Sequence, residues 1–163
     1  MDAMNELEQL FERQQANGVY RWLSPASQHR LERAVQPRGW RVFHLDGRLT
    51  HDKTSFLRAA AAALEFPGYF GRNWDAFEEM INDLAWTPAA GYVLLYDHLW
   101  RFACAQPEAW GVARAILETA CAQWAEEGKP FIVLLRHTHG CSGVAALLRA
   151  PRPHHRALRR RLR

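Results

Sequence analysis

The chain has 163 residues, of which 48% are hydrophobic and 23% charged, a composition that indicates about one globular domain and excludes a disordered chain. No run approaches about 20 consecutive apolar residues, which excludes a transmembrane helix, and the acidic N-terminus lacks the apolar segment of a signal peptide, so we expect a cytoplasmic protein. The net charge of +4 is unevenly distributed, because residues 40–136 carry twelve acidic against nine basic residues whereas residues 137–163 carry seven Arg and no acid.

Residues 1–39 predict a small α/β extension. Residues 2–16 have the apolar spacing of an amphipathic helix, and residues 19–23 predict a strand. A second helix is expected over residues 24–35, because Pro25 fits the first helical position. We expect this extension to pack on or beside the core that follows.

The next segment, residues 40–136, alternates short apolar strands with helices. This alternation predicts an α/β domain with a small parallel sheet joined by right-handed crossovers. Asp52 and Asn73 stand where helix N-caps are expected. The strands are expected at residues 42–45, 92–96 and 131–135, and the helices at residues 53–65, 73–84 and 107–127.

Residues 137–163 contain glycine, proline and arginine without apolar periodicity, which predicts a disordered basic tail. Such a tail either contacts nucleic acid by neutralising phosphates or serves as a solvating arm. His137-x-His139-x-Cys141 resembles part of a metal site, because it offers three possible ligands. No fourth ligand follows at a suitable spacing, so we predict no metal. The three scattered cysteines favour buried thiols in a reducing compartment over a disulfide framework.

The helix expected at residues 73–84 is acidic on the side away from its apolar stripe. Asp75 and Glu79 are four residues apart, so they are neighbours on one face and repel each other by a few tenths of a kcal/mol. No Lys or Arg follows at helical spacing to offset them. Two readings stay open at this point, a solvated helix face and a surface whose counter-charge comes from a cationic partner.

The segment Tyr69 to Phe77, Tyr-Phe-Gly-Arg-Asn-Trp-Asp-Ala-Phe, resembles the barstar family, whose members inhibit bacterial ribonucleases. Further similarity follows in Asp83-Leu84-Ala85-Trp86, in the strand 91–96, and in Trp124 to Phe131, so that the resemblance covers residues 40–136. It implies a three-stranded parallel sheet covered by helices. It also implies an inhibitor without catalysis, cofactor or small-molecule substrate, which binds one basic ribonuclease and no membrane.

The resemblance also implies which side chains face the partner. Three of these positions depart from the family pattern. Glu79 stands where the family has an Asp, Glu78 replaces an aromatic residue, and Gln123 stands where a second acid is found. The implied partner-binding residues are Tyr69, Asn73, Trp74, Asp75, Glu78, Glu79, Trp86, Gln123 and Glu127.

Sequence motifs of enzymes are missing. There is no Gly-rich phosphate loop, no His-Glu-x-x-His and no Gly-x-Ser-x-Gly elbow. The resemblance, and not this absence, leads us to expect a ribonuclease inhibitor whose acidic helix occupies the phosphate positions of the nuclease active site. The alternative is a non-inhibitory regulatory module on the same scaffold that binds protein or RNA.

Overall fold

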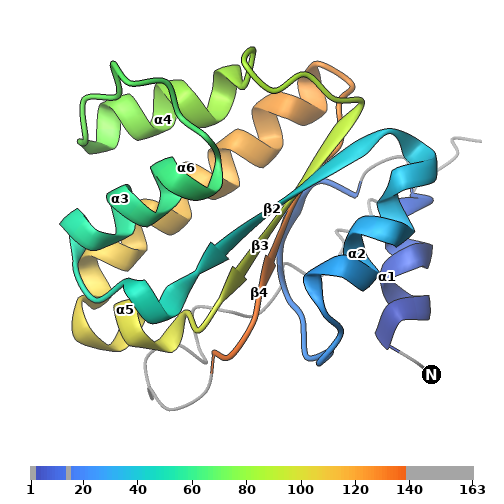
Figure 1. Cartoon of the computed structure of the whole chain (residues 1–163), viewed down its shortest axis with the longest axis horizontal. Coiled ribbons are helices and arrows are strands. Elements are labelled where there is room, and N and C mark those ends of the chain that lie inside the picture. Colours follow the sequence, from blue (N-terminus) through green and yellow to red (C-terminus); the bar gives the residue numbers. More distant parts are fainter. Residues whose placement is uncertain (1–2, 14–15, 139–163) are drawn as a thin grey trace, which may run out of the picture.

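A four-stranded parallel sheet in the order β1-β4-β3-β2 separates two layers of helices in the computed structural model (Figure 1). The structure describes residues 3–13 and 16–138. The strands are β1 (Gly18–Arg21), β2 (Trp40–Asp46), β3 (Gly91–Asp97) and β4 (Phe131–Leu135). The helices are α1 (Ala3–Phe11), α2 (Gln28–Val35), α3 (Lys53–Ala63), α4 (Trp74–Asp83), α5 (Trp100–Ala105) and α6 (Pro107–Glu126).

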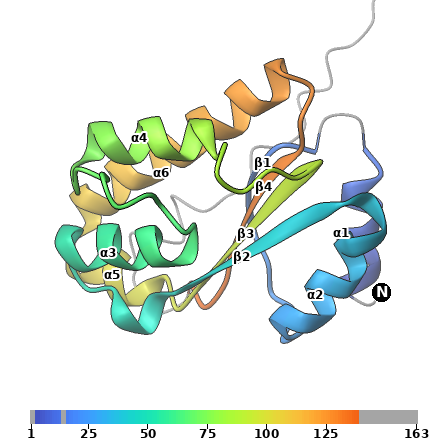
Figure 2. The same cartoon turned by 45° about the horizontal axis from the view of Figure 1, so that its top comes forward.

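Each face of the sheet is covered because side chains alternate along every strand. Tyr92, Leu94 and Tyr96 of β3 belong to the larger core beneath α3 to α6, whereas Val93 and Leu95 belong to a second core beneath α1 and α2. Figure 2 shows these two helical layers on opposite sides of the sheet. Both central strands are fully buried, which explains their continuous apolar sequences.

The expectation of three strands is wrong, because β1 adds a fourth strand at the outer edge of β4. It pairs in parallel, with Gly18 opposite Ile132 and Arg21 opposite Leu135. The Asn17 side chain secures the same edge by donating to the carbonyl of Lys129 at 3.0 Å and accepting from the amide of Phe131 at 3.0 Å. The added strand satisfies backbone groups that an edge strand leaves unpaired. The other expectations, a parallel sheet and covering helices, are confirmed.

Both helices that precede β2 have boundaries that differ from the prediction. Helix α1 ends at Phe11, well short of residue 16. Helix α2 begins only after Ser27, whose side chain caps the amide of Arg30. The Ser24 hydroxyl instead accepts from the amide of Ala26, so the Ser24-Pro25 pair forms a turn before the helix.

The short helix α5 was not predicted, because six residues give too little periodicity to recognise. Cys121 is a buried free thiol as expected, but Cys104 is disulfide-bonded, so the expectation of free thiols is wrong for Cys104. The predicted tail lies outside the described residues except for His137 and Thr138. Among the helices that the structure describes, none combines the length and apolar character needed to cross a membrane.

Candidate functional site

Helix α4 exposes its acidic residues on a firmly anchored scaffold. Asn73 caps the helix by accepting from the amide of Ala76 at 2.8 Å. Phe77, Met80 and Ile81 are buried beneath the helix. The acids Asp75, Glu78, Glu79 and Asp83 are all exposed on the outer side.

None of these four acids forms an ion pair with a residue in the described part of the chain. Acids elsewhere do find cations: Glu118 pairs with Arg114 at 2.9 Å on α6, and Asp46 pairs with Arg48 at 2.7 Å. Helix α4 thus carries four exposed acids without a counter-charge from the described residues, unlike these two paired acids. A surface of this kind attracts cationic partners and repels nucleic acid.

The loop between α3 and α4 presents an aromatic side chain beside this acidic face. Phe66 and Phe70 stack edge-to-face at 4.9 Å and pack against the core, which fixes the loop. Tyr69 lies between them in sequence, yet its exposed fraction is 72%. Arg72 has a φ of 51°, so the chain turns sharply before the Asn73 cap. Tyr69 is thus held out into solvent by anchored neighbours.

Two of the expected contact residues, Trp74 and Trp86, are only half exposed. The Trp74 ring packs at 5.9 Å from Phe56, and the ammonium of Lys53 lies 5.4 Å above it. Trp86 donates from Nε1 to the carbonyl of Leu64 at 3.0 Å. Both indoles therefore support the loop and α4, and each leaves only part of its surface for a partner.

Helix α6 lies alongside α4 and contributes the remaining expected residues (Figure 2). The buried Trp124 donates from Nε1 to the carbonyl of Ile81 at 3.0 Å, which joins the C-terminal parts of the two helices. Gln123 and Glu127 flank Trp124 in the sequence and are exposed. The negative end of the α6 dipole faces the same region, so Glu127 gains no stabilisation from its own helix.

A shallow groove between α4 and α6 adds an acid that the sequence did not single out. Glu78 lines it from α4, and Glu108, Val112 and Ile116 line it from α6. Val112 is 42% exposed, so the groove presents apolar surface together with its two acids. Glu108 lies about five turns from Glu127 along α6, and only the packing of α6 on α4 relates it to Glu78.

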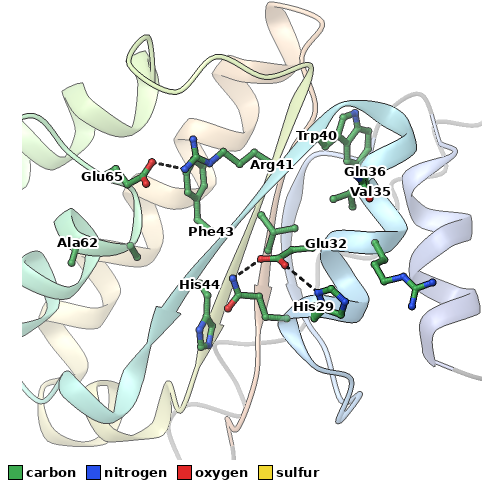
Figure 3. Close-up of a pocket in the computed structure, with 14 residues that line it drawn as sticks. His29, Glu32, Val35, Gln36, Trp40, Arg41, Phe43, His44, Ala62 and Glu65 are labelled. Atoms are coloured by element: carbon green, nitrogen blue, oxygen red, sulfur yellow. Dashed lines mark hydrogen bonds and ion pairs between the residues drawn. The ribbon is translucent and has the colours of Figure 1, made fainter.

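A larger depression of about 700 Å³ follows the outer edge of β2, between α2 and α3 (Figure 3). Both of its acids, Glu32 and Glu65, already have partners among the lining residues. Glu32 accepts from Gln28 at 2.7 Å and lies 3.8 Å from His29, and Arg41 forms an ion pair with Glu65. None of the residues expected to bind a partner lines this depression.

The one described free thiol is unsuited to nucleophilic chemistry. Cys121 is 3% exposed, and burial raises the pKa of its thiol to about 12. A thiol that stays protonated at neutral pH is a poor nucleophile. Cys121 therefore belongs to the core between α6 and β1.

Comparison with known proteins locates one family along the chain. The sequence model of the family described as Barstar (barnase inhibitor) matches residues 40–136. The match begins at the first residue of β2 and ends directly after β4. It thus includes α4, its preceding loop and α6, and excludes α1, β1 and α2. The search of curated proteins found no match to the chain.

Proposed function

The chain belongs to the barstar family, and from this premise we propose that it inhibits a basic ribonuclease by covering the active site of the nuclease with the acidic face of α4. A ribonuclease active site holds cationic side chains that bind phosphates. Carboxylates on a rigid helix can occupy the phosphate positions and form charge-assisted hydrogen bonds with those cations. Inhibition of this kind requires shape and charge and no catalytic step.

The observation that carries this proposal is the unpaired charge on α4. Asp75, Glu78 and Glu79 are exposed and lack ion pairs with the described residues, although other acids of the chain are paired. Bringing these carboxylates together without cations destabilises the helix, by a few tenths of a kcal/mol for each like-charged pair. Binding of a cationic partner would relieve this repulsion between carboxylates, and that relief would favour the complex.

The remaining residues fit this proposal in two roles. Tyr69, Gln123 and Glu127 are exposed and would contact the nuclease around the acidic centre. Asn73 and Trp86 use their polar atoms within the chain, at 2.8 Å to the amide of Ala76 and at 3.0 Å to the carbonyl of Leu64. Asn73 and Trp86 would therefore stabilise the shape of the binding surface. The exposed parts of their side chains would contact the partner. The half-buried Trp74 would combine both roles.

The decisive experiment measures RNA hydrolysis by a panel of basic bacterial ribonucleases with and without the purified chain. We expect at least one nuclease to be inhibited in a complex of one copy each, measured by titration calorimetry. The Glu8→Ala variant is a matched control, because Glu8 is an exposed acid on α1, on the other side of the sheet. It should inhibit like the wild type. If no nuclease binds, the proposal is wrong.

The second candidate is a non-inhibitory module that associates with RNA through its basic tail. The seven Arg and no acid of residues 137–163 favour it. Binding of a fluorescent single-stranded RNA should then be lost when the chain ends at Thr138 and should weaken steeply with salt. Inhibition of a nuclease by that shortened chain would instead assign the activity to the acidic face.

A further inference from the structure

Two histidines meet where β3 and β4 end. His98 follows Asp97 at the end of β3, and His137 follows Arg136 after β4. Both histidines have positive φ angles, 52° and 50°, which non-glycine residues adopt only infrequently. Their rings lie 4.4 Å apart between centroids. Two matching left-handed residues therefore turn two imidazoles toward one point at the carboxyl edge of the sheet.

The carboxylate of Asp97 lies at the same point. Its Oδ1 is 3.3 Å from Nδ1 of His137. Its Oδ2 is 2.8 Å from Nε2 of His44 and accepts from Nη2 of Arg136 at 2.8 Å. Asp97 is only 5% exposed, so its position is fixed by these neighbours. One donor atom from each of Asp97, His98 and His137 lies within 4.8 Å of the others.

The Nδ1 atom of His98 has no hydrogen bond to a described residue. It is also buried. A buried polar atom without a hydrogen bond destabilises the fold. The backbone around it is held tightly, because a Cβ on Gly47 would lie 1.9 Å from the carbonyl oxygen of Asp97 and 2.7 Å from that of His98. The unpaired nitrogen is thus built into the fold.

We propose that Asp97, His98 and His137 bind a divalent transition-metal ion of the zinc type. Two imidazole nitrogens and one carboxylate oxygen are ligands that such ions prefer, and a fourth position is left for water. A tetrahedral zinc ion holds its ligand atoms about 3.3–3.5 Å apart, so the three donor atoms must approach one another by at most about 1.5 Å. His44 and Arg136 would orient the carboxylate through their hydrogen bonds to its oxygens.

Arg136 affects how tightly the site would bind an ion and determines which parts of the chain the ion would connect. Its guanidinium bonds to both Asp97 oxygens, so its positive charge opposes the ion and weakens binding. Its Nη1 also donates to the carbonyls of Ser24 and Ala26. An ion bound here would therefore cross-link the ends of β3 and β4, next to the start of α2. We assign it a structural role, separate from the acidic face.

The sequence motif groups His137 with different residues, and no metal was predicted from that motif. His139 and Cys141 are its neighbours in sequence, and they lie outside the described residues. The structure instead places His137 beside the ends of β3, through the parallel pairing of β3 with β4. The two groupings make different predictions for metal binding.

The test is titration of the whole chain with Zn²⁺, followed by calorimetry, and with Co²⁺, followed by its visible d–d absorption. We expect one saturable site per chain and a higher unfolding temperature with Zn²⁺. His98→Asn and His137→Asn should each weaken binding at least about tenfold. Asparagine is chosen because it tolerates positive φ and so keeps the backbone conformation. His51→Ala, an exposed histidine elsewhere, should bind like the wild type.

Two results would overturn the proposal. One is the lack of any saturable Zn²⁺ binding by the folded wild-type chain. The other is full binding by His98→Asn together with loss of binding in the double variant His139→Ala/Cys141→Ser, which would assign the metal to the sequence motif. Retained binding in that double variant supports the site at the sheet edge.

Discussion

The indole Nε1 of Trp124 donates a hydrogen bond of 3.0 Å to the main-chain carbonyl of Ile81, and this bond fixes α6 against α4. It places Glu127, at the end of α6, in a constant relation to the acids of α4. The partner surface therefore consists of two helices that hold a common geometry before any partner arrives, which reduces the entropy lost on binding.

The first prediction tests this bond. Trp124→Phe should lower the free energy of unfolding by about 1–3 kcal/mol, because it leaves the Ile81 carbonyl without its indole donor. It should also weaken binding of the ribonuclease by loosening α6 against α4. Urea unfolding and binding titration measure the two effects.

Trp110→Phe is the matched control for this prediction. Trp110 is a buried tryptophan of the same helix, and its Nε1 has no hydrogen-bond partner among the described residues. Its replacement loses the same ring volume but no hydrogen bond. Binding by Trp110→Phe should stay at the wild-type level. Equal loss of binding in both variants would show that the bond to Ile81 does not shape the surface.

The second prediction concerns the acidic face. Asp75→Ala and Glu79→Ala should each weaken ribonuclease binding by about 3–5 kcal/mol, because each would leave a buried cation of the partner without its counter-charge. Their free energies of unfolding should be unchanged or slightly higher, since like-charge repulsion on α4 is reduced. Inhibition curves and thermal melts of both variants are compared with Glu8→Ala. Wild-type inhibition by both would leave α4 as an ordinary solvated face.

The third prediction concerns a core residue, whose replacement should affect stability much more than binding. Phe77 is 1% exposed and packs edge-to-face on Phe56 at 5.5 Å between ring centroids. Phe77→Ala should lower the free energy of unfolding by about 3–5 kcal/mol. Under conditions where the variant is still folded, binding should be much less affected than in Asp75→Ala. Stopped-flow binding at low temperature, with circular dichroism to verify folding, measures this.

The fourth prediction concerns ionic strength. If the unpaired acids steer the encounter, the association rate constant should fall as salt shortens the Debye length to about 8 Å at physiological ionic strength, while the dissociation rate constant changes less. A chain ending at Thr138 should associate at least as fast as the whole chain, because the removed basic tail repels a basic partner. A salt-independent association rate would contradict steering.

The fifth prediction concerns the N-cap of α3. The amide and hydroxyl of Ser55 donate to Asp52, and these hydrogen bonds lower the pKa of the Asp52 carboxyl. A carboxyl with a lowered folded pKa stabilises the protein above its ordinary pKa near 4, and this contribution is lost as the pH falls toward the folded pKa. Asp52→Asn keeps a capping oxygen but does not titrate. The wild type should therefore lose stability relative to Asp52→Asn in acid titrations followed by thermal melts.

Several parts of the fold follow from short stretches of sequence. Asn73 and Asp52 cap the helices they were expected to cap, because a cap depends on the side chain and the three residues after it. The apolar sequences of β3 and β4 identified buried central strands for a similarly local reason. Ser24-Pro25 gave the wrong helix start, because Ser27 offers an equally good cap three residues later.

The candidate site was predictable only in part. The acids of α4 and the motif around Tyr69 can be read directly, and the family match over residues 40–136 confirms the resemblance. Nothing in the sequence showed that much of the surface of Trp74 and Trp86 is buried by contacts within the chain. Glu108 could not be found either, since its relation to Glu78 comes from a groove between two helices.

By itself, the sequence determined the family, the parallel α/β class and the acidic character of α4, because motif, periodicity and charge are local properties of the chain. The tertiary structure decided that β1 extends the sheet beside β4, that Trp124 fixes α6 on α4, and that His98 and His137 meet beside Asp97. Each of these joins residues at least 39 positions apart, apart from the neighbours Asp97 and His98. Such contacts depend on how whole elements pack, and a local sequence pattern does not determine which element will pack against it.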